Sequence, residues 1–164
     1  MSKSSIPFIK MQGAGNDFIL MDNRSLKLSE EYLTELAPSI CNRKFGIGSD
    51  GLITLNYDEK KKADLVMLYK NPDGSDAGMC GNGARCFAAY AVTLGSPKEF
   101  TFRVHDHIYR ANVKKSGVTI SFPLETTVDA IDLEGYNAYS VYTNTEHIVC
   151  PVAPEQLEEE PMLV

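Results

Sequence analysis

The sequence contains no long hydrophobic run and has more acidic than basic residues. None of its apolar stretches approaches the about 18 residues that a membrane-spanning helix requires. Its first residues, MSKSSIPFIKMQ, include neither an apolar signal core nor a small-residue cleavage site. We therefore expect a cytoplasmic protein that does not contact a membrane. The formal net charge of −6 argues against nucleic acid as a partner, because nucleic-acid-binding proteins normally present a basic face.

The four cysteines form neither a CxxC motif nor a common zinc-binding pattern. Cysteines of a cytoplasmic chain are expected to be reduced thiols. Cys80 and Cys86 are six positions apart and would face different sides of a helix, so they are a poor pair of metal ligands. Without CxxC, thiol–disulfide redox chemistry is disfavoured. We therefore expect neither a metal site nor a redox protein.

The composition is that of a globular protein. The chain has 164 residues, of which 43% are hydrophobic and 23% are charged. This is enough apolar material for one ordinary core or for two small lobes. No internal repeat is evident. Pro123 marks a candidate boundary, which divides the chain into residues 1–123 and residues 124–164.

Apolar runs bounded by turn signals predict many short strands. We expect two strands within residues 7–22, separated by a glycine-rich turn, and further strands at 52–57 and 64–70. A meander of strands should follow over residues 99–123, with one or two more strands beyond Pro123. Together with the helices described next, this pattern predicts an α+β fold.

Two helices are predicted. Ser29 is a suitable cap for a helix through SEEYLTELAPSICN, whose apolar residues recur at helical spacing. Pro38 lies inside this segment and predicts a kink or an early stop. The second helix follows Cys80 and ends near Gly95 and Pro97. Its small apolar residues predict burial on all sides, so it must be covered by sheet.

The stretch NPDGSDAGMCGNGARCFAAYAVTL places Cys80 where a glycine-rich turn becomes this apolar helix. The first N–H groups of a helix have no intrahelical acceptor, and the helix dipole is positive there. Both effects favour the thiolate form of a cysteine, which can act as a base or a nucleophile. The N–H groups of Gly81, Asn82 and Gly83 can hold a carboxylate. This motif could remove the α-proton of a bound amino acid; the alternative is a small buried residue at a turn.

Asn16 and Asn71 each lie in a turn beside a predicted strand, where side chains gather at one end of a fold. An asparagine amide offers a donor and an acceptor, which suits the ammonium and carboxylate groups of an amino acid. The alternative is that each side chain satisfies the backbone of its own turn. The residues alone leave both interpretations open.

Three motifs, KMQGAGNDFI, FGIGSDGL and NPDGSDAGMCGNGARCFA, resemble the diaminopimelate epimerase family in order and spacing. They span residues 10–88, and the resemblance runs on to about residue 150. It implies a curved mixed or antiparallel sheet around a central helix in each of two lobes. It also implies interconversion of LL- and meso-diaminopimelate, for lysine and cell-wall precursor biosynthesis. Two cysteines on opposite faces of the α-carbon act as base and acid, with neither pyridoxal phosphate nor metal.

The resemblance implies roles for particular residues. Cys80 matches the catalytic cysteine of the first lobe, and Gly81 and Asn82 match the residues whose N–H groups hold the α-carboxylate. Asn16 and Asn71 match substrate-contact positions. The substrate is then a small molecule, diaminopimelate, and no cofactor is expected.

His147 matches a histidine of a Gly-x-Pro-His segment that tunes the family's thiols. Here Asn144 and Glu146 replace the glycine and the proline. His147 could keep the tuning role, or it could be a structural or merely exposed histidine of a strand.

The second half of the family pattern is missing. No ACGTG-like motif follows, and Cys150 has neither a glycine turn nor a helix after it. We therefore expect residues 1–123 to be the N-terminal epimerase lobe and residues 124–164 to be the start of an incomplete second lobe. One cysteine cannot return a proton to the opposite face. A homodimer, or association with a missing second lobe, is expected.

Three origins of such a chain remain open: a fragment, one of two docking chains, or a truncated relative with another role. Two other functions also remain open. One is a non-catalytic module that binds a small carboxylate. The other is an isomerase of the proline-racemase or phenazine type with the same fold.

Overall fold

The computed structural model describes residues 5–123, 126–133, 135–143 and 146–154. Asn144, which stands in place of the glycine of the Gly-x-Pro-His segment, lies outside the described residues, as do residues 155–164. The chain divides into two compact units, Met1–Pro123 and Leu124–Val164. Each unit is described by itself.

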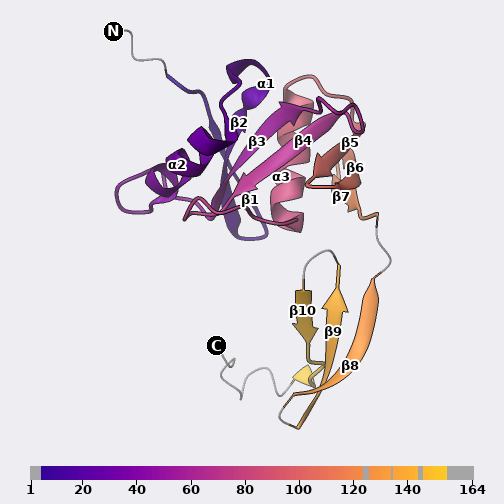
Figure 1. The fold of residues 1–164 in the computed structure, drawn as a ribbon. Helices are drawn as coiled ribbons and strands as arrows, with labels where there is room; N and C mark the ends of the chain where they lie inside the picture. Colours follow the sequence, from indigo (N-terminus) through magenta and orange to yellow (C-terminus); the bar gives the residue numbers. More distant parts are fainter. Residues whose placement is uncertain (1–4, 124–125, 134, 144–145, 155–164) are drawn as a thin grey trace. The chain divides into compact units, whose positions relative to one another are not determined.

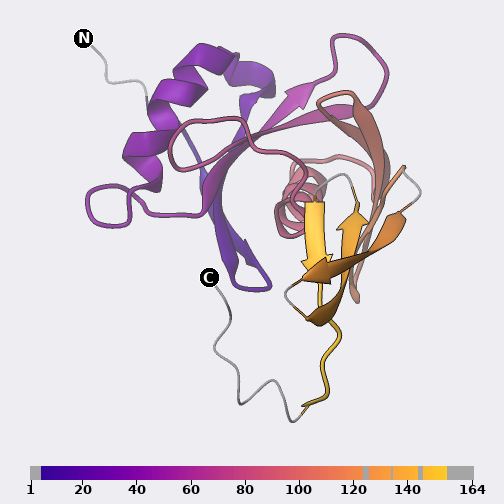
Figure 2. The same ribbon diagram turned by 60° about the horizontal axis from the view of Figure 1, so that its bottom comes forward.

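The first unit is built on one mixed sheet with the strand order β1-β2-β3-β4-β5-β6-β7 (Figure 1). Neighbours β2–β3 and β4–β5 are parallel, and the remaining neighbouring pairs are antiparallel. Figure 2 shows the sheet curling around one helix, α3 (Gly81–Thr93). The strands are β1 (Ile9–Gly13), β2 (Asn16–Asp22), β3 (Gly51–Tyr57), β4 (Leu65–Lys70), β5 (Glu99–Val104), β6 (His107–Lys114) and β7 (Gly117–Ser121).

The central strands are apolar on both faces because each face is covered by a helix. In β2, Phe18 belongs to the core cluster around α3, whereas Ile19 belongs to a second cluster beneath α2 (Glu30–Cys41). In β3, Ile53 belongs to the cluster around α3, and Leu52 belongs to the cluster beneath α2. This is the period-2 alternation of a strand between two layers. The short helix α1 (Asn23–Leu26) follows β2 and contacts β3.

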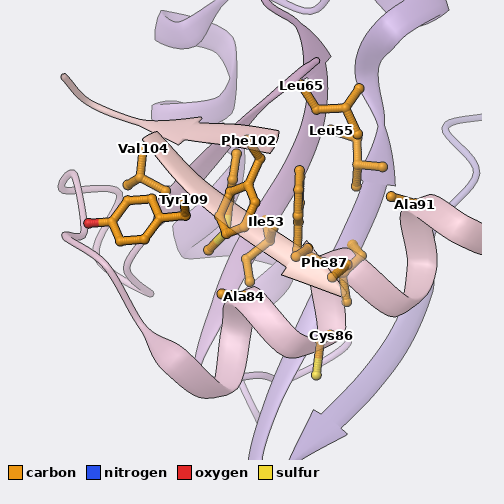
Figure 3. Close-up of a cluster of buried hydrophobic side chains, with 14 of the residues drawn as sticks. Ile53, Leu55, Leu65, Ala84, Cys86, Phe87, Ala91, Phe102, Val104 and Tyr109 are labelled. Atoms are coloured by element: carbon orange, nitrogen blue, oxygen red, sulfur yellow. The ribbon is translucent and has the colours of Figure 1, made fainter. Parts of the chain in front are cut away.

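Small residues let α3 lie close to the concave face of the sheet. Ala84, Ala88 and Ala91 are fully buried, and so is Phe87. The Phe87 ring packs against Phe102 of β5 at a centroid distance of 5.2 Å (Figure 3). The predicted α+β class, with a curved mixed sheet around a central helix, is confirmed.

The helix α2 begins where the sequence predicts, but it does not end early at Pro38. Ser29 caps it, because the Ser29 side chain accepts a hydrogen bond from the Tyr32 backbone. The helix does not stop early, however, and continues through Pro38 to Cys41. Proline removes one helical hydrogen bond, but Leu33, Ala37 and Cys41 all remain buried on this helix. Burial of that face outweighs the loss.

The second unit contains a three-stranded antiparallel sheet in the order β10-β9-β8. Its strands are β8 (Thr127–Leu133), β9 (Tyr136–Tyr142) and β10 (Glu146–Val149). The expectation of one or two strands was therefore too low. The third strand, EHIV, has four residues, which is too short for its alternation to be read with certainty from sequence.

Candidate active site

Cys80 is the N-cap of α3. Its backbone is extended, with φ −115° and ψ 115°, and its Sγ atom accepts a hydrogen bond from the Gly83 backbone at 3.4 Å. Its carbonyl accepts the first helical hydrogen bond, from Ala84 at 2.8 Å. Within the described part of the chain, no acceptor is recorded for the backbone N–H groups of Gly81 and Asn82. Two donors are therefore available beside the thiol, at the positive end of the helix dipole.

The two glycines after Cys80 have different surroundings. A Cβ atom at Gly83 would lie 2.9 Å from Ile53 Cδ1, so this glycine permits the close packing of the helix start on β3. At Gly81, a Cβ atom would meet only Arg85 Nη1, at 3.8 Å. The space beside Gly81 is thus open on one side and next to a guanidinium group. An anion can approach the free N–H groups from this side.

The turn between β1 and β2 contacts the start of α3. Asn82 Nδ2 donates to Asn16 Oδ1 at 2.6 Å, and Asn82 Oδ1 accepts from Arg85 Nη2. The approach is close also at Gly13, where a Cβ atom would lie 3.0 Å from the Asn82 carbonyl oxygen. The structure therefore brings together Asn16 and Asn82, two of the residues singled out from the sequence.

An ionic cluster adjoins Asn16. Asp50, which immediately precedes β3, accepts hydrogen bonds from Asn16 Nδ2 at 3.2 Å and from the Asp17 backbone at 3.1 Å. Arg43 Nη2 lies 2.6 Å from Asp50 and 2.7 Å from Asp17. Lys10 also pairs with Asp17, at 3.0 Å. The cluster joins the first two motifs.

These contacts keep both carboxylates ionised. The Asp17 pKa is lowered well below its usual range, mainly by the hydrogen bond from Arg43. The Asp50 pKa is also lowered, mainly by the hydrogen bond from Asn16. Both groups therefore act as acceptors at neutral pH.

Two further groups of the core lie near Cys80. Burial raises the pKa of Tyr69 to about 12, with the nearby Cys80 and Asp50 adding to the shift. Burial also raises the pKa of the Cys86 thiol. Both groups are protonated at neutral pH, so neither is a base there. Figure 3 shows Cys86 among the core residues, and its Sγ would lie 3.4 Å from a Cβ atom at Gly13.

Asn71 is engaged in its own turn. Its Nδ2 donates to Ser75 Oγ at 3.1 Å, and its backbone nitrogen donates to the Ser75 carbonyl at 2.9 Å. Within the described residues, no hydrogen bond joins Asn71 to Asn16 or Asn82. The structure thus has the local arrangement, which is one of the two interpretations that the sequence left open. The bond to Ser75 uses one of the two Nδ2 hydrogens of Asn71.

The segment between Asn71 and Cys80 is anchored at two points. Buried Lys70 pairs with Asp76 and also lies 3.3 Å from Glu30 of α2. His105 Nε2 lies 3.1 Å from the Ala77 carbonyl oxygen. The connection that leads to Cys80 is therefore attached to β4 through Asp76 and to the β5–β6 turn through Ala77.

His147 and Cys150 lie in the second unit. His147 is exposed on β10, opposite Val141 of β9, and Cys150 directly follows β10 and is exposed. Of the other cysteines, Cys41 and Cys86 are buried in the first unit. Among the described cysteines, Cys80 is the one at a helix start.

A match to a family model covers most of the first unit. Residues 8–123 match the model described as diaminopimelate epimerase, which is more than half of the chain. The chain belongs to the diaminopimelate epimerase family. Several curated relatives carry the name diaminopimelate epimerase. The protein from Flavobacterium psychrophilum is 43% identical over 110 residues, which cover 66% of this chain and 42% of the relative. The protein from Alkaliphilus metalliredigens is 46% identical over 99 residues, covering 60% and 34%.

The chain thus spans less than half the length of these diaminopimelate epimerases. A solved structure described as a predicted epimerase from Pseudomonas aeruginosa is similar in fold, with a TM-score of 0.66 and 14% identity. That likeness covers 94% of this chain and 62% of the solved one. The likeness in fold to this solved structure therefore extends over nearly all of the chain.

The family motifs contain residues whose contacts sequence reasoning missed. Asp17, Asp50 and Arg85 stand inside the three motifs, yet only Asn16, Asn71 and the residues around Cys80 were singled out. Their position beside those residues was the available signal.

In the parts of the chain that the structure describes, no cluster of three His, Cys, Asp or Glu side chains could hold a metal ion. No described helix is long and apolar enough to cross a membrane.

Proposed function

We propose that this chain supplies the first half of a diaminopimelate epimerase site. In this proposal Cys80 exchanges the α-proton of LL- or meso-diaminopimelate from one face, in the cytoplasm, for lysine and cell-wall precursor biosynthesis. No cofactor takes part. The observation that carries the proposal is the N-cap cysteine beside two backbone N–H groups without a recorded acceptor in the described chain. Family membership over residues 8–123 supports the choice of substrate.

The start of α3 suits a carboxylate bonded to a reacting carbon. The N–H groups of Gly81 and Asn82 would hold the α-carboxylate, and the open side at Gly81 admits it. The helix dipole and the Arg85 guanidinium add positive potential at the same place. This charge stabilises the carbanion-like species that forms as the proton leaves, because that species shares its negative charge with the carboxylate.

Cys80 is placed to act as the base. The Gly83 N–H group points at its sulfur, and a hydrogen bond to a thiolate is stronger than one to a thiol. Proton removal forms the S–H bond as the Cα–H bond breaks, and the electron pair stays on the substrate. Return of the proton by Cys80 gives the starting isomer. Inversion requires a second acid on the other face, and we propose that it comes from outside this half of the site.

The second unit supports the proposal that a second lobe is incomplete here. Alternation along β8, β9 and β10 puts apolar side chains on both faces of this sheet. One face carries Ile131, Leu133, Tyr136, Tyr142 and Ile148, and the other carries Val128, Tyr139, Val141 and Val149. A sheet with two apolar faces is normally covered on both. We propose that the cover is the remainder of a second lobe, since the relatives are more than twice as long as the matched region.

Light scattering coupled to size-exclusion chromatography tests whether the remainder of a second lobe covers the sheet of the second unit. The proposal expects a chain that is monomeric or weakly self-associating and that binds a separately produced C-terminal half of a relative. A stable homodimer with no affinity for such a half would overturn it, because the second copy would then be the cover.

Exchange of the α-proton in heavy water tests the function. The chain is incubated with LL- and with meso-diaminopimelate, and deuterium incorporation and stereochemistry are followed by mass spectrometry and chiral chromatography. Exchange with retention supports a half site that works from one face. Exchange with inversion would show that a second acid is present. Absence of exchange both alone and with a complementary second lobe, in a folded protein, would overturn the proposal.

Matched controls separate the alternatives. Cys150→Ala removes an exposed cysteine of the second unit and should leave exchange unchanged. Proline and hydroxyproline, offered in the same assay, test the proline-racemase alternative. Binding of diaminopimelate without exchange, with or without a second lobe, would favour a carboxylate-binding module.

A further inference from the structure

Four side chains beside the proposed carboxylate site form a hydrogen-bond chain with a single direction. Arg85 Nη2 donates to Asn82 Oδ1, and Asn82 Nδ2 donates to Asn16 Oδ1 at 2.6 Å. Asn16 Nδ2 then donates to Asp50 Oδ2 at 3.2 Å. This hydrogen-bond chain joins Asn16 to Asp50, which are 34 positions apart in the sequence, and Asn16 to Asn82, which are 66 positions apart. All four residues belong to the first unit.

The two charged ends set this direction. A guanidinium group only donates hydrogen bonds, and an ionised carboxylate only accepts them. Reversal of the Asn16 amide would place its oxygen against the Asp50 carboxylate. Reversal of the Asn82 amide would place its nitrogen against the Arg85 guanidinium. Each reversal replaces a hydrogen bond by repulsion, so both amides are held in one orientation.

Asp50 is itself fixed from three sides. Besides Asn16, its Oδ2 accepts from the Asp17 backbone at 3.1 Å, and its Oδ1 accepts from Arg43 Nη2 at 2.6 Å. The Asp50 backbone also donates to the Asp17 carbonyl at 2.8 Å. A carboxylate held so firmly is a suitable end point for a chain of otherwise exposed amides.

The fixed orientation bears on ligand binding at the start of α3. Each amide nitrogen carries two hydrogens, and the hydrogen-bond chain described above uses one of them. The other remains a donor for a carboxylate, and on Asn82 it accompanies the backbone N–H group. We propose that Asp50 is a positioning residue, which through Asn16 fixes Asn82 for carboxylate binding. The inference rests on the proposed function, in which a carboxylate binds there.

Asp50→Asn in the full chain tests the proposal. The substituted amide can donate as well as accept, so residue 50 no longer excludes reversal of the Asn16 amide, and Arg85 becomes the one charged end that still sets the direction of the hydrogen-bond chain. In ¹⁵N-labelled protein, the side-chain NH₂ resonances of Asn16 and Asn82 should shift. Those of Asn112, whose Nδ2 donates to Glu99 at 2.5 Å, should stay in place. Acetate and diaminopimelate, titrated against the backbone resonances of Gly81 and Asn82, should bind about tenfold more weakly.

Asp22→Asn is the matched control. Asp22 also pairs with an arginine, Arg24, at 2.8 Å, and it caps α1, a task that asparagine performs equally well. This variant should leave the resonances of Asn16 and Asn82 unchanged. Arg85→Gln removes the other charged end and should shift the same resonances, which keeps the test available if Asp50→Asn fails to fold.

The outcomes separate this inference from the proposed function. Unchanged amide resonances in the substituted chains, or shifted resonances with undiminished acetate binding, would overturn the role of Asp50. A wild-type chain that binds acetate but not diaminopimelate would instead contradict the proposed substrate. The comparison of Asp50→Asn with wild type, using acetate, would still decide the role of Asp50.

Discussion

The backbone nitrogen of Gly83 lies 3.4 Å from the sulfur of Cys80 and donates to it. This contact occupies one of the free N–H groups at the start of α3 and leaves those of Gly81 and Asn82 for a ligand. The helix dipole places positive potential at the same point. Reactivity of the sulfur is the observable consequence.

We expect iodoacetamide to label Cys80 faster than the other cysteines near neutral pH. Cys41 and Cys86 are buried, and burial raises the pKa of both thiols, so they should be protected. Cys150 is exposed, but it follows the strand β10 and does not cap a described helix. Peptide mass spectrometry over a time course measures all four rates, with urea-unfolded protein as the reference for complete labelling. Faster labelling of Cys150 than of Cys80 would contradict the assignment.

Cys80→Ala and Cys86→Ala should have opposite effects on catalysis and stability. Cys80→Ala should abolish α-proton exchange in any competent assembly and leave the circular dichroism spectrum unchanged. Cys86 is buried against β1, so Cys86→Ala should reduce the free energy of unfolding by about 1 kcal/mol and change exchange little. Urea unfolding and the deuterium assay measure the two quantities. Retained α-proton exchange in Cys80→Ala would show that Cys80 is not the catalytic base.

The residues around Cys80 were predictable because their signals are local. A cap, free N–H groups and a run of small apolar residues all depend on neighbours within one helix. The contacts of Asp50 with Asn16, and of Asn16 with Asn82, depend instead on how β1, β2, β3 and α3 pack. Single-sequence patterns carry no information about such pairing. The sequence therefore indicated the thiol but not the groups that orient its neighbours.

Pro38 and β10 show two further limits. The rule that proline stops a helix is local, and burial of the other face of α2 overrides it. The strand β10 has four residues, which are too few for their alternation to distinguish a strand from a loop, although β10 pairs with the strand that precedes it in the sequence. Asn71 was indicated by the family motif, whereas its bonds to Ser75 follow the ordinary chemistry of a turn.

Gly51→Ala should be destabilising, whereas Gly78→Ala should be tolerated. A Cβ atom at position 51 would lie 2.3 Å from Tyr69 Cε2 and 2.8 Å from the Lys70 carbonyl oxygen, so the ring and the strand backbone must both move. Such overpacking costs about 1–3 kcal/mol. At Gly78 no atom lies within 4 Å of the added Cβ, and the change should stay within about 0.5 kcal/mol. Urea unfolding compares the two. Equal stability of both variants would contradict the close packing of β3 against β4.

Acid should remove the contribution of Asp17 to stability. The hydrogen bond from Arg43 lowers the pKa of Asp17 in the folded protein, while an unfolded aspartate titrates near about 3.9. Below that pH the unfolded chain takes up the proton first, so the contribution is complete above about pH 4 and is lost as pH falls towards the folded pKa.

Asp17→Asn should therefore be less stable than wild type at neutral pH, and the difference should narrow steadily below about pH 4. Urea unfolding at a series of pH values measures both curves. Asp106→Asn, which removes an exposed carboxylate from the β5–β6 turn, controls for the change in net charge. A difference between Asp17→Asn and wild type that stays constant down to about pH 2 would mean that the Asp17–Arg43 pair contributes nothing through ionisation. The effect of the substitution would then arise from packing alone.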